Sequence, residues 1–208
     1  MKKFKAYIFD LDGTILDSTP INIESFLYSC RVHLGKEVTL NEFRKLFGRP
    51  LLEQMQHYSK EKAQDMVETY RTYMDKIHDE KVKLFPGSIE VLKMLKENNI
   101  KCALVTSKAR SFAQRALNLF DIDKYFDVKV FHEDCTNHKP HPEPYLLAID
   151  KMGFPSYEIL SIGDSPYDVI ASREAGLKTA VVDWSDFSKE DIEKVKPDYI
   201  IHDLKEIL

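Results

Sequence analysis

The sequence has few cysteines and no long hydrophobic run, and each absence excludes a class of protein. Its three cysteines are far apart and show no paired spacing, so they imply neither a disulfide framework nor a zinc site. No stretch approaches the roughly 18 consecutive apolar residues of a membrane-spanning helix. The apolar run near the N-terminus ends at Asp10 and is too short for the core of a signal peptide. We therefore expect a cytoplasmic protein without a membrane partner.

The chain also lacks an excess of basic residues. Its formal net charge is −4 and its sequence pI is about 6.0, which gives no general attraction to nucleic acid. A small anionic ligand would need a local positive site. The 208 residues, 43% hydrophobic and 31% charged, can form one core or a domain with a smaller insertion. The sequence leaves the oligomeric state open.

Apolar strands alternate with helices over most of the chain. Residues 6–9 are apolar strand formers and predict a buried strand. Further strands are expected at 102–105, 128–131, 159–162, 179–182 and 199–201, with helices at 88–98, 110–119, 142–152 and 165–175. This alternation is typical of an α/β fold, a parallel sheet with helices on both faces.

A helical segment interrupts the alternation after the first strand. From residue 21 to about 81 the apolar residues recur at helical spacing and no convincing strand is present. A capping box at 39–42 predicts the start of a helix that ends near Gly48, and residues 60–80 predict one long helix. We therefore expect a core of residues 1–15 and 84–208, with residues 16–83 as an all-helical insertion.

The first candidate site follows the first predicted strand. Asp10 and Asp12 are one residue apart at the end of this strand, and Gly13 and Thr14 follow directly. Ligands of open α/β sheets bind at that edge. Two crowded carboxylates repel each other, and a bound cation or a shared proton would offset the repulsion. The alternative is an ordinary turn, because Asp and Gly are common turn residues.

Three later segments also place polar groups at strand ends or helix starts. Thr106 and Ser107 follow a predicted strand, where hydroxyl and backbone donors would emerge near Asp10. Lys139 lies in a proline-containing loop before a helix and could face an anion, or could be a solvated surface lysine. Asp164 follows an apolar strand and a glycine, and Asp168 comes one helical turn later.

Taken in order, these four segments resemble the motifs of the haloacid dehalogenase superfamily. The resemblance covers nearly the whole chain, and the order and spacing of the segments make it specific. It implies a Rossmann-like parallel sheet, with residues 16–83 as a helical cap of the family's first type.

The resemblance also implies a phosphoryl-transfer mechanism. Asp10 would be the nucleophile that forms an aspartyl phosphate, and Asp12 would be the acid and base. Mg²⁺ would be held by Asp10, the backbone carbonyl of Asp12, and Asp164. The phosphate-binding candidates are Gly13, Thr14, Thr106, the Ser107 backbone and Lys139. Asp168 would orient Lys139 or the metal shell, with Ser165 in a supporting role.

Asp12 favours a phosphatase over relatives with other chemistry. Dehalogenases have no acid at this position, and phosphonatases have an alanine there. The implied function is hydrolysis of a small phosphomonoester such as phosphoglycolate, and the alternative substrate is inorganic pyrophosphate. A β-phosphoglucomutase-type transferase and a non-catalytic phosphate-binding module stay open. Arg49, on a loop of the expected cap, is the candidate for pairing with a carboxylate or second phosphate of the substrate, or is a surface arginine.

Overall fold

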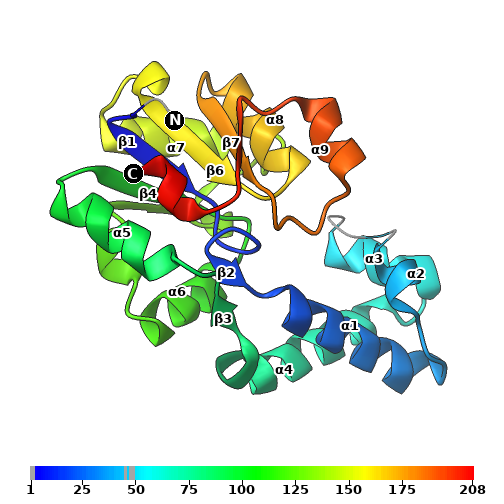
Figure 1. Ribbon diagram of the computed structural model, residues 1–208. Coiled ribbons are helices and arrows are strands. Elements are labelled where there is room, and N and C mark those ends of the chain that lie inside the picture. The colour runs from blue at the N-terminus through cyan, green and yellow to red at the C-terminus, as the bar shows by residue number, and fades with distance from the viewer. Residues whose placement is uncertain (1–2, 45, 47–49) are drawn as a thin grey trace. The chain divides into compact units, whose positions relative to one another are not determined.

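The computed structural model describes residues 3–44, 46 and 50–208 (Figure 1). It divides into two compact units, and each is described by itself. One unit combines Met1–Asp17 with Leu84–Leu208, and the other is Ser18–Lys83. Within the described ranges, no helix is both long and apolar enough to cross a membrane.

The first unit is built on a six-stranded parallel sheet with the strand order β5-β4-β1-β6-β7-β8. The strands are β1 (Ala6–Phe9), β4 (Lys101–Val105), β5 (Val128–Val130), β6 (Ile159–Gly163), β7 (Lys178–Val182) and β8 (Tyr199–Ile201). In the register of the central strands, Phe9 lies beside Leu104 on one side and Ile162 on the other. The segments that follow β1, β4 and β6 therefore leave the sheet at one shared edge.

Helices cover the sheet and confirm the predicted α/β fold. The helices of this unit are α5 (Ser88–Glu97), α6 (Arg110–Leu119), α7 (Glu143–Met152), α8 (Pro166–Glu174) and α9 (Lys189–Val195), with 3-10 helices η1 (Asp123–Tyr125), η2 (His132–Asp134), η3 (Ser156–Glu158) and η4 (Leu204–Ile207). Residues of α7 and α8 share a buried cluster with Ala6 and Ile8 on one face of β1. On the other face, Tyr7 OH donates a hydrogen bond of 2.9 Å to the carbonyl of Ile207 in η4.

The predicted elements match the observed ones to within a few residues. The sequence pattern does not predict the four short 3-10 helices or α9, a seven-residue helix. Its polar sequence carries little periodic signal, and it begins where the Ser188 side chain accepts a hydrogen bond from the Asp191 backbone N–H.

Among its described residues, the second unit has helices as its regular structure apart from its connection to the first. These helices are α1 (Thr19–Leu34), α2 (Leu40–Arg44), α3 (Leu51–Tyr58) and α4 (Ala63–Lys81), and the connecting chains form the short strands β2 (Leu16–Asp17) and β3 (Lys83–Leu84). Phe26, Met55 and Met66 belong to its buried core. The predicted capping box is present at the start of α2, where Thr39 N–H donates to Glu42 Oε2 at 2.8 Å and Glu42 N–H donates to Thr39 Oγ1 at 3.3 Å. The predicted end of this helix, Gly48, lies outside the described residues.

Candidate active site

The loop after β1 is shaped by a close approach between two motifs. Asp10 is 7% exposed, and its backbone N–H donates to the carbonyl of Ile162 at 2.9 Å, which continues the pairing of β1 with β6. Gly13 follows with a φ of 79°, a conformation that a side chain strains. A Cβ atom at Gly13 would also overlap the Asp164 carboxylate. The glycine of the first motif therefore lets the acid of the last motif come close to the loop.

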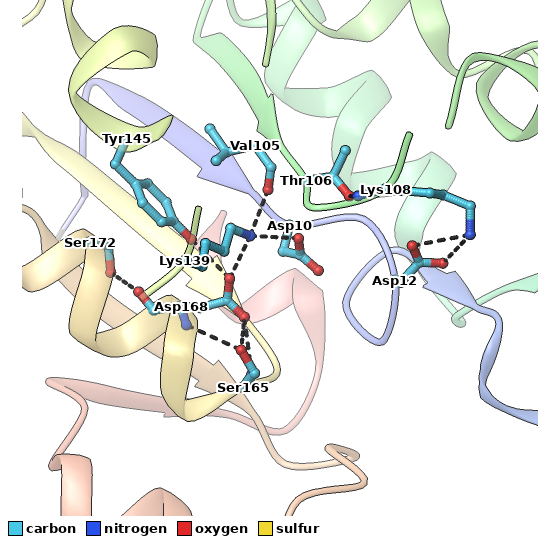
Figure 2. Close-up of polar contacts among 10 residues, drawn as sticks. All are labelled: Asp10, Asp12, Val105, Thr106, Lys108, Lys139, Tyr145, Ser165, Asp168 and Ser172. Carbon is cyan, nitrogen blue, oxygen red and sulfur yellow. Dashed lines mark hydrogen bonds and ion pairs between the residues drawn. The ribbon is translucent and has the colours of Figure 1, made fainter. Parts of the chain in front are cut away.

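The side chain of Lys139 is buried between two carboxylates (Figure 2). Its ammonium donates to Asp10 Oδ1 at 2.7 Å, Asp168 Oδ1 at 2.6 Å and the carbonyl of Val105 at 2.8 Å. Burial acts to lower the pKa of Lys139, but the two aspartates outweigh it and hold that pKa well above its usual range. A buried charge is tolerated when it is paired and fully hydrogen-bonded, and Lys139 meets both conditions.

Asp168 is fixed by contacts on both carboxylate oxygens. It forms a capping box at the start of α8, in which its Oδ2 accepts from Ser165 Oγ at 2.5 Å and from the Ser165 backbone N–H at 3.1 Å. Its Oδ1 accepts from Lys139 and from the Tyr145 hydroxyl at 3.0 Å. A Cβ atom at Gly163 would lie 2.5 Å from Asp168 Cγ, so this glycine gives Asp168 its space. Asp168 thus contacts Lys139 through one carboxylate oxygen and Ser165 through the other.

Asp10, Asp164 and Asp168 form a buried acidic cluster in which one oxygen from each lies within 4.8 Å of the others. Burial raises the pKa of Asp164 well above its usual range, and the nearby Asp168 and Asp10 raise it further. Burial also raises the pKa of Asp10 to about 7, against the opposing effect of Lys139. Three carboxylates around one ammonium leave excess negative charge, and an oxygen-only ligand set of this kind fits a hard divalent cation.

Asp12 faces a lysine that the sequence analysis did not single out. Lys108 Nζ lies 2.9 Å from Asp12 Oδ1 and 3.2 Å from Oδ2 (Figure 2). Lys108 directly follows the Thr106–Ser107 pair, and this position next to a motif is the feature of the sequence that could have identified it as a site residue. Its contact with Asp12 depends on β4 lying next to β1, which the sequence alone does not specify.

The other predicted site residues lie in different surroundings. Thr106 is buried, its N–H donates to the carbonyl of Val130 at 3.0 Å, and its Oγ1 accepts from the Lys108 N–H at 3.1 Å. Ser107 is exposed at the same edge. Thr14 is fully buried, and its hydroxyl has no hydrogen-bond partner among the described residues. Arg49 lies outside the described residues.

The chain belongs to the haloacid dehalogenase-like hydrolase family, whose model matches residues 7–182. It is 46% identical over 206 residues to a protein of Caldanaerobacter subterraneus subsp. tengcongensis named "Putative pyrophosphatase PpaX", covering 99% of this chain and 94% of that protein. It is 33% identical to "Pyrophosphatase PpaX" of Halalkalibacterium halodurans, with 99% and 96% covered. A crystal structure described as a predicted phosphoglycolate phosphatase from Haemophilus somnus 129PT superposes with a TM-score of 0.89 at 26% identity, covering 100% of this chain and 97% of that one.

These similarities confirm the family that the four motifs indicate, and they identify the chain as an enzyme, a phosphatase of this family. Its substrates are therefore phosphorylated compounds.

Proposed function

We propose that this phosphatase hydrolyses inorganic pyrophosphate with the help of Mg²⁺, through an aspartyl phosphate formed on Asp10. The observation that carries the chemistry is the buried contact between Asp10 and Lys139, which places a nucleophilic carboxylate beside a fixed positive charge. The choice of pyrophosphate is supported by the names of the relatives that match almost the full length of this chain.

In the first step an Asp10 oxygen attacks one phosphorus atom and forms the acyl phosphate. The bond from that phosphorus to the bridging oxygen breaks, and its electron pair stays on the leaving phosphate. The leaving oxygen takes the proton of the Asp12 carboxyl group. Lys139 and Thr106 would bind the oxygens of the transferred phosphoryl group, which the contact of Lys139 with Asp10 supports, and the backbone N–H of the exposed residue Ser107 would add a donor.

In the second step Asp12, now a carboxylate, accepts a proton from water. The resulting hydroxide attacks phosphorus, the bond between phosphorus and the Asp10 oxygen breaks, and phosphate leaves. Asp10 returns as a carboxylate and Asp12 as an acid, so each turnover restores both groups. One water and one pyrophosphate give two phosphates.

The acidic cluster would hold the metal ion. Asp10, Asp164 and the backbone carbonyl of Asp12 are the proposed ligands, because both Asp168 oxygens already accept hydrogen bonds from protein groups. When bound, Mg²⁺ supplies positive charge that lets an anionic nucleophile approach an anionic substrate.

A phosphomonoester such as phosphoglycolate is the second candidate substrate. It is favoured by the solved structure described as a predicted phosphoglycolate phosphatase, which covers the whole chain at 26% identity. In either case we propose that the helical insertion of residues 16–83, including Arg49, acts as the cap that selects the substrate.

Phosphate release from a substrate panel tests this proposal. The purified protein with Mg²⁺ is given pyrophosphate, phosphoglycolate, p-nitrophenyl phosphate, β-glucose 1-phosphate and nucleoside monophosphates. Asp10→Asn should abolish turnover, and Asp150→Asn, a matched change at an exposed position on α7, should not. Chelation by EDTA should remove activity until Mg²⁺ is restored.

The panel separates the alternatives. The highest kcat/KM with pyrophosphate supports the proposal, and the highest value with phosphoglycolate supports the second candidate. Isomerisation of β-glucose 1-phosphate without phosphate release would indicate a mutase. Binding of phosphate compounds without any turnover would indicate a non-catalytic module.

A further inference from the structure

Lys108 places a second positive charge at the site, separate from the one provided by Lys139. Its side chain is 11% exposed, whereas that of Lys139 is 6% exposed and enclosed by two carboxylates and a carbonyl. The Lys108 ammonium faces both oxygens of Asp12, at 2.9 and 3.2 Å. Figure 2 shows Lys108 and Asp12 on one side of Asp10, with Lys139 and Asp168 on the other.

The backbone of Lys108 is fixed on both sides of its Cα atom. Its N–H donates to Thr106 Oγ1 at 3.1 Å, and its carbonyl accepts from the His132 N–H at 3.3 Å. These contacts hold the residue in the turn that follows β4. The Lys108 ammonium is therefore held beside Asp12 by the ion pair and by the two hydrogen bonds that fix its backbone.

The position of Asp12 decides which part of a substrate Lys108 would meet. A group that donates a proton to the leaving oxygen must lie within hydrogen-bond reach of that oxygen. Because Lys108 Nζ contacts both Asp12 oxygens, the leaving group enters next to this ammonium. The transferred phosphoryl group lies instead beside Asp10 and Lys139 and is common to every substrate.

Charge then distinguishes one leaving group from another. Once Asp12 has given its proton to the leaving oxygen, its carboxylate and an anionic leaving group are two negative charges side by side, and the ammonium of Lys108 offsets their repulsion. A neutral leaving group brings no such charge and gains little from the lysine. We propose that Lys108 is a specificity-determining residue that binds the anionic part of the leaving group and favours phosphate or carboxylate there over a neutral alcohol.

This inference deepens the proposed function and rests on Asp12 acting at the leaving group. It applies to both candidate substrates, since pyrophosphate releases phosphate and phosphoglycolate releases a carboxylate-bearing alcohol. Ethyl phosphate provides the matched neutral case, because its leaving group is similar in size to glycolate and carries no charge.

The test compares kcat/KM for pyrophosphate, phosphoglycolate and ethyl phosphate in the wild type, Lys108→Met and Lys108→Arg. The ratio of either anionic substrate to ethyl phosphate should fall about 10- to 100-fold in Lys108→Met, the range expected for a lost charge-assisted hydrogen bond. Lys108→Arg should recover part of the ratio because it keeps the charge. Lys93→Met removes an exposed lysine on α5 and should leave the ratio as in the wild type.

A binding measurement gives a second readout. In an Asp10→Asn background, calorimetric titration with phosphoglycolate in the presence of Mg²⁺ should show weaker binding when Lys108→Met is added. If Lys108→Met does not fold, the kcat/KM ratios of the wild type and Lys108→Arg still test the inference. A wild type that shows no preference for anionic leaving groups over ethanol overturns it.

The two proposals fail in different ways. If the wild type hydrolyses other anionic phosphate compounds but not pyrophosphate, the proposed function is wrong, and the ratio of phosphoglycolate to ethyl phosphate still tests Lys108. If the wild type prefers pyrophosphate and Lys108→Met lowers kcat/KM by the same factor for all three substrates, the proposed function stands and the role of Lys108 is refuted.

Discussion

Replacing Lys139 with methionine removes the ammonium that lies between Asp10 and Asp168. Methionine keeps most of the volume and the flexible stem, so the main change is the loss of charge and of three donated hydrogen bonds. Asp10, Asp164 and Asp168 then lie within 4.8 Å of one another without this positive charge.

The expected cost follows from the burial of the pair. Lys139 is 6% exposed and its partners are 10% and 4% exposed, so solvent screens these charges poorly. Removing one partner of a buried ion pair costs about 3–5 kcal/mol. For a chain of this size that corresponds to a fall in melting temperature of about 6–20 °C. The fall should become smaller as the pH is lowered, because protonation of the carboxyl groups removes their repulsion.

Thermal unfolding in EDTA, followed by circular dichroism between pH 5 and 8, measures this cost. The control is Lys178→Met, which removes an exposed lysine paired with Asp198 and should change the melting temperature little. A Lys139→Met protein that is inactive but as stable as this control would refute the charge-balance argument. Equal destabilisation at pH 5 and pH 8 would refute the assignment of the cost to carboxylate repulsion.

Three further changes test other parts of the site. Gly13→Ala should lower stability and abolish activity, because the new Cβ atom would overlap the Asp164 carboxylate and the backbone has positive φ; unchanged kinetics would contradict this close approach. In the metal-free protein the pKa of Asp10 is raised to about 7 and that of Asp164 is also raised, so the folded state binds more protons than the unfolded state. The free energy of unfolding should therefore fall as pH rises from about 4 to 7. Mg²⁺ should then bind with proton release, which calorimetry in two buffers of different ionisation enthalpy would detect; affinity independent of pH would contradict it. Tyr145→Phe removes the hydroxyl that donates to Asp168 and should cost about 1–3 kcal/mol while leaving measurable activity. A neutral effect on denaturant unfolding would show that this hydrogen bond does not support the site.

The fold was predictable because buried parallel strands carry a strong signal. The run of β1 is buried along its whole length, as are four of the five residues of β4 and all of β6, and such strands are continuous apolar segments in the sequence. The short helix α9 was missed because its seven mostly charged residues show no apolar periodicity.

The site was predictable to the extent that it depends on strand ends. Parallel strands release their following residues at one edge, so Asp10, Thr106 and Asp164 could be expected near one another before any strand order was known. Contacts that depend on the order of the strands and on the geometry of the turns could not be predicted from the sequence. Lys108 reaches Asp12 only because β4 is the neighbour of β1, and nothing in the local sequence specifies that neighbour.

Gly13 and Thr14 also have surroundings that a short motif could not predict. Gly13 was assigned to phosphate binding, and the structure adds a steric requirement set by Asp164, a residue 151 positions later in the chain. Thr14 was assigned to the same role, and its burial could not be read from a motif of six residues. Its part in phosphate binding stays a prediction.

The most direct test of the central claim is to trap the phosphorylated enzyme. Protein turning over pyrophosphate with Mg²⁺ is quenched in acid and reduced with borohydride, which converts an aspartyl phosphate to homoserine, and the peptides are then sequenced by mass spectrometry. If Asp10 is the nucleophile, homoserine is found at position 10, Asp12 is unmodified, and no conversion occurs when substrate is omitted. Steady turnover with an unmodified Asp10, or with the reduced product at another side chain, would contradict the role of Asp10 as the nucleophile.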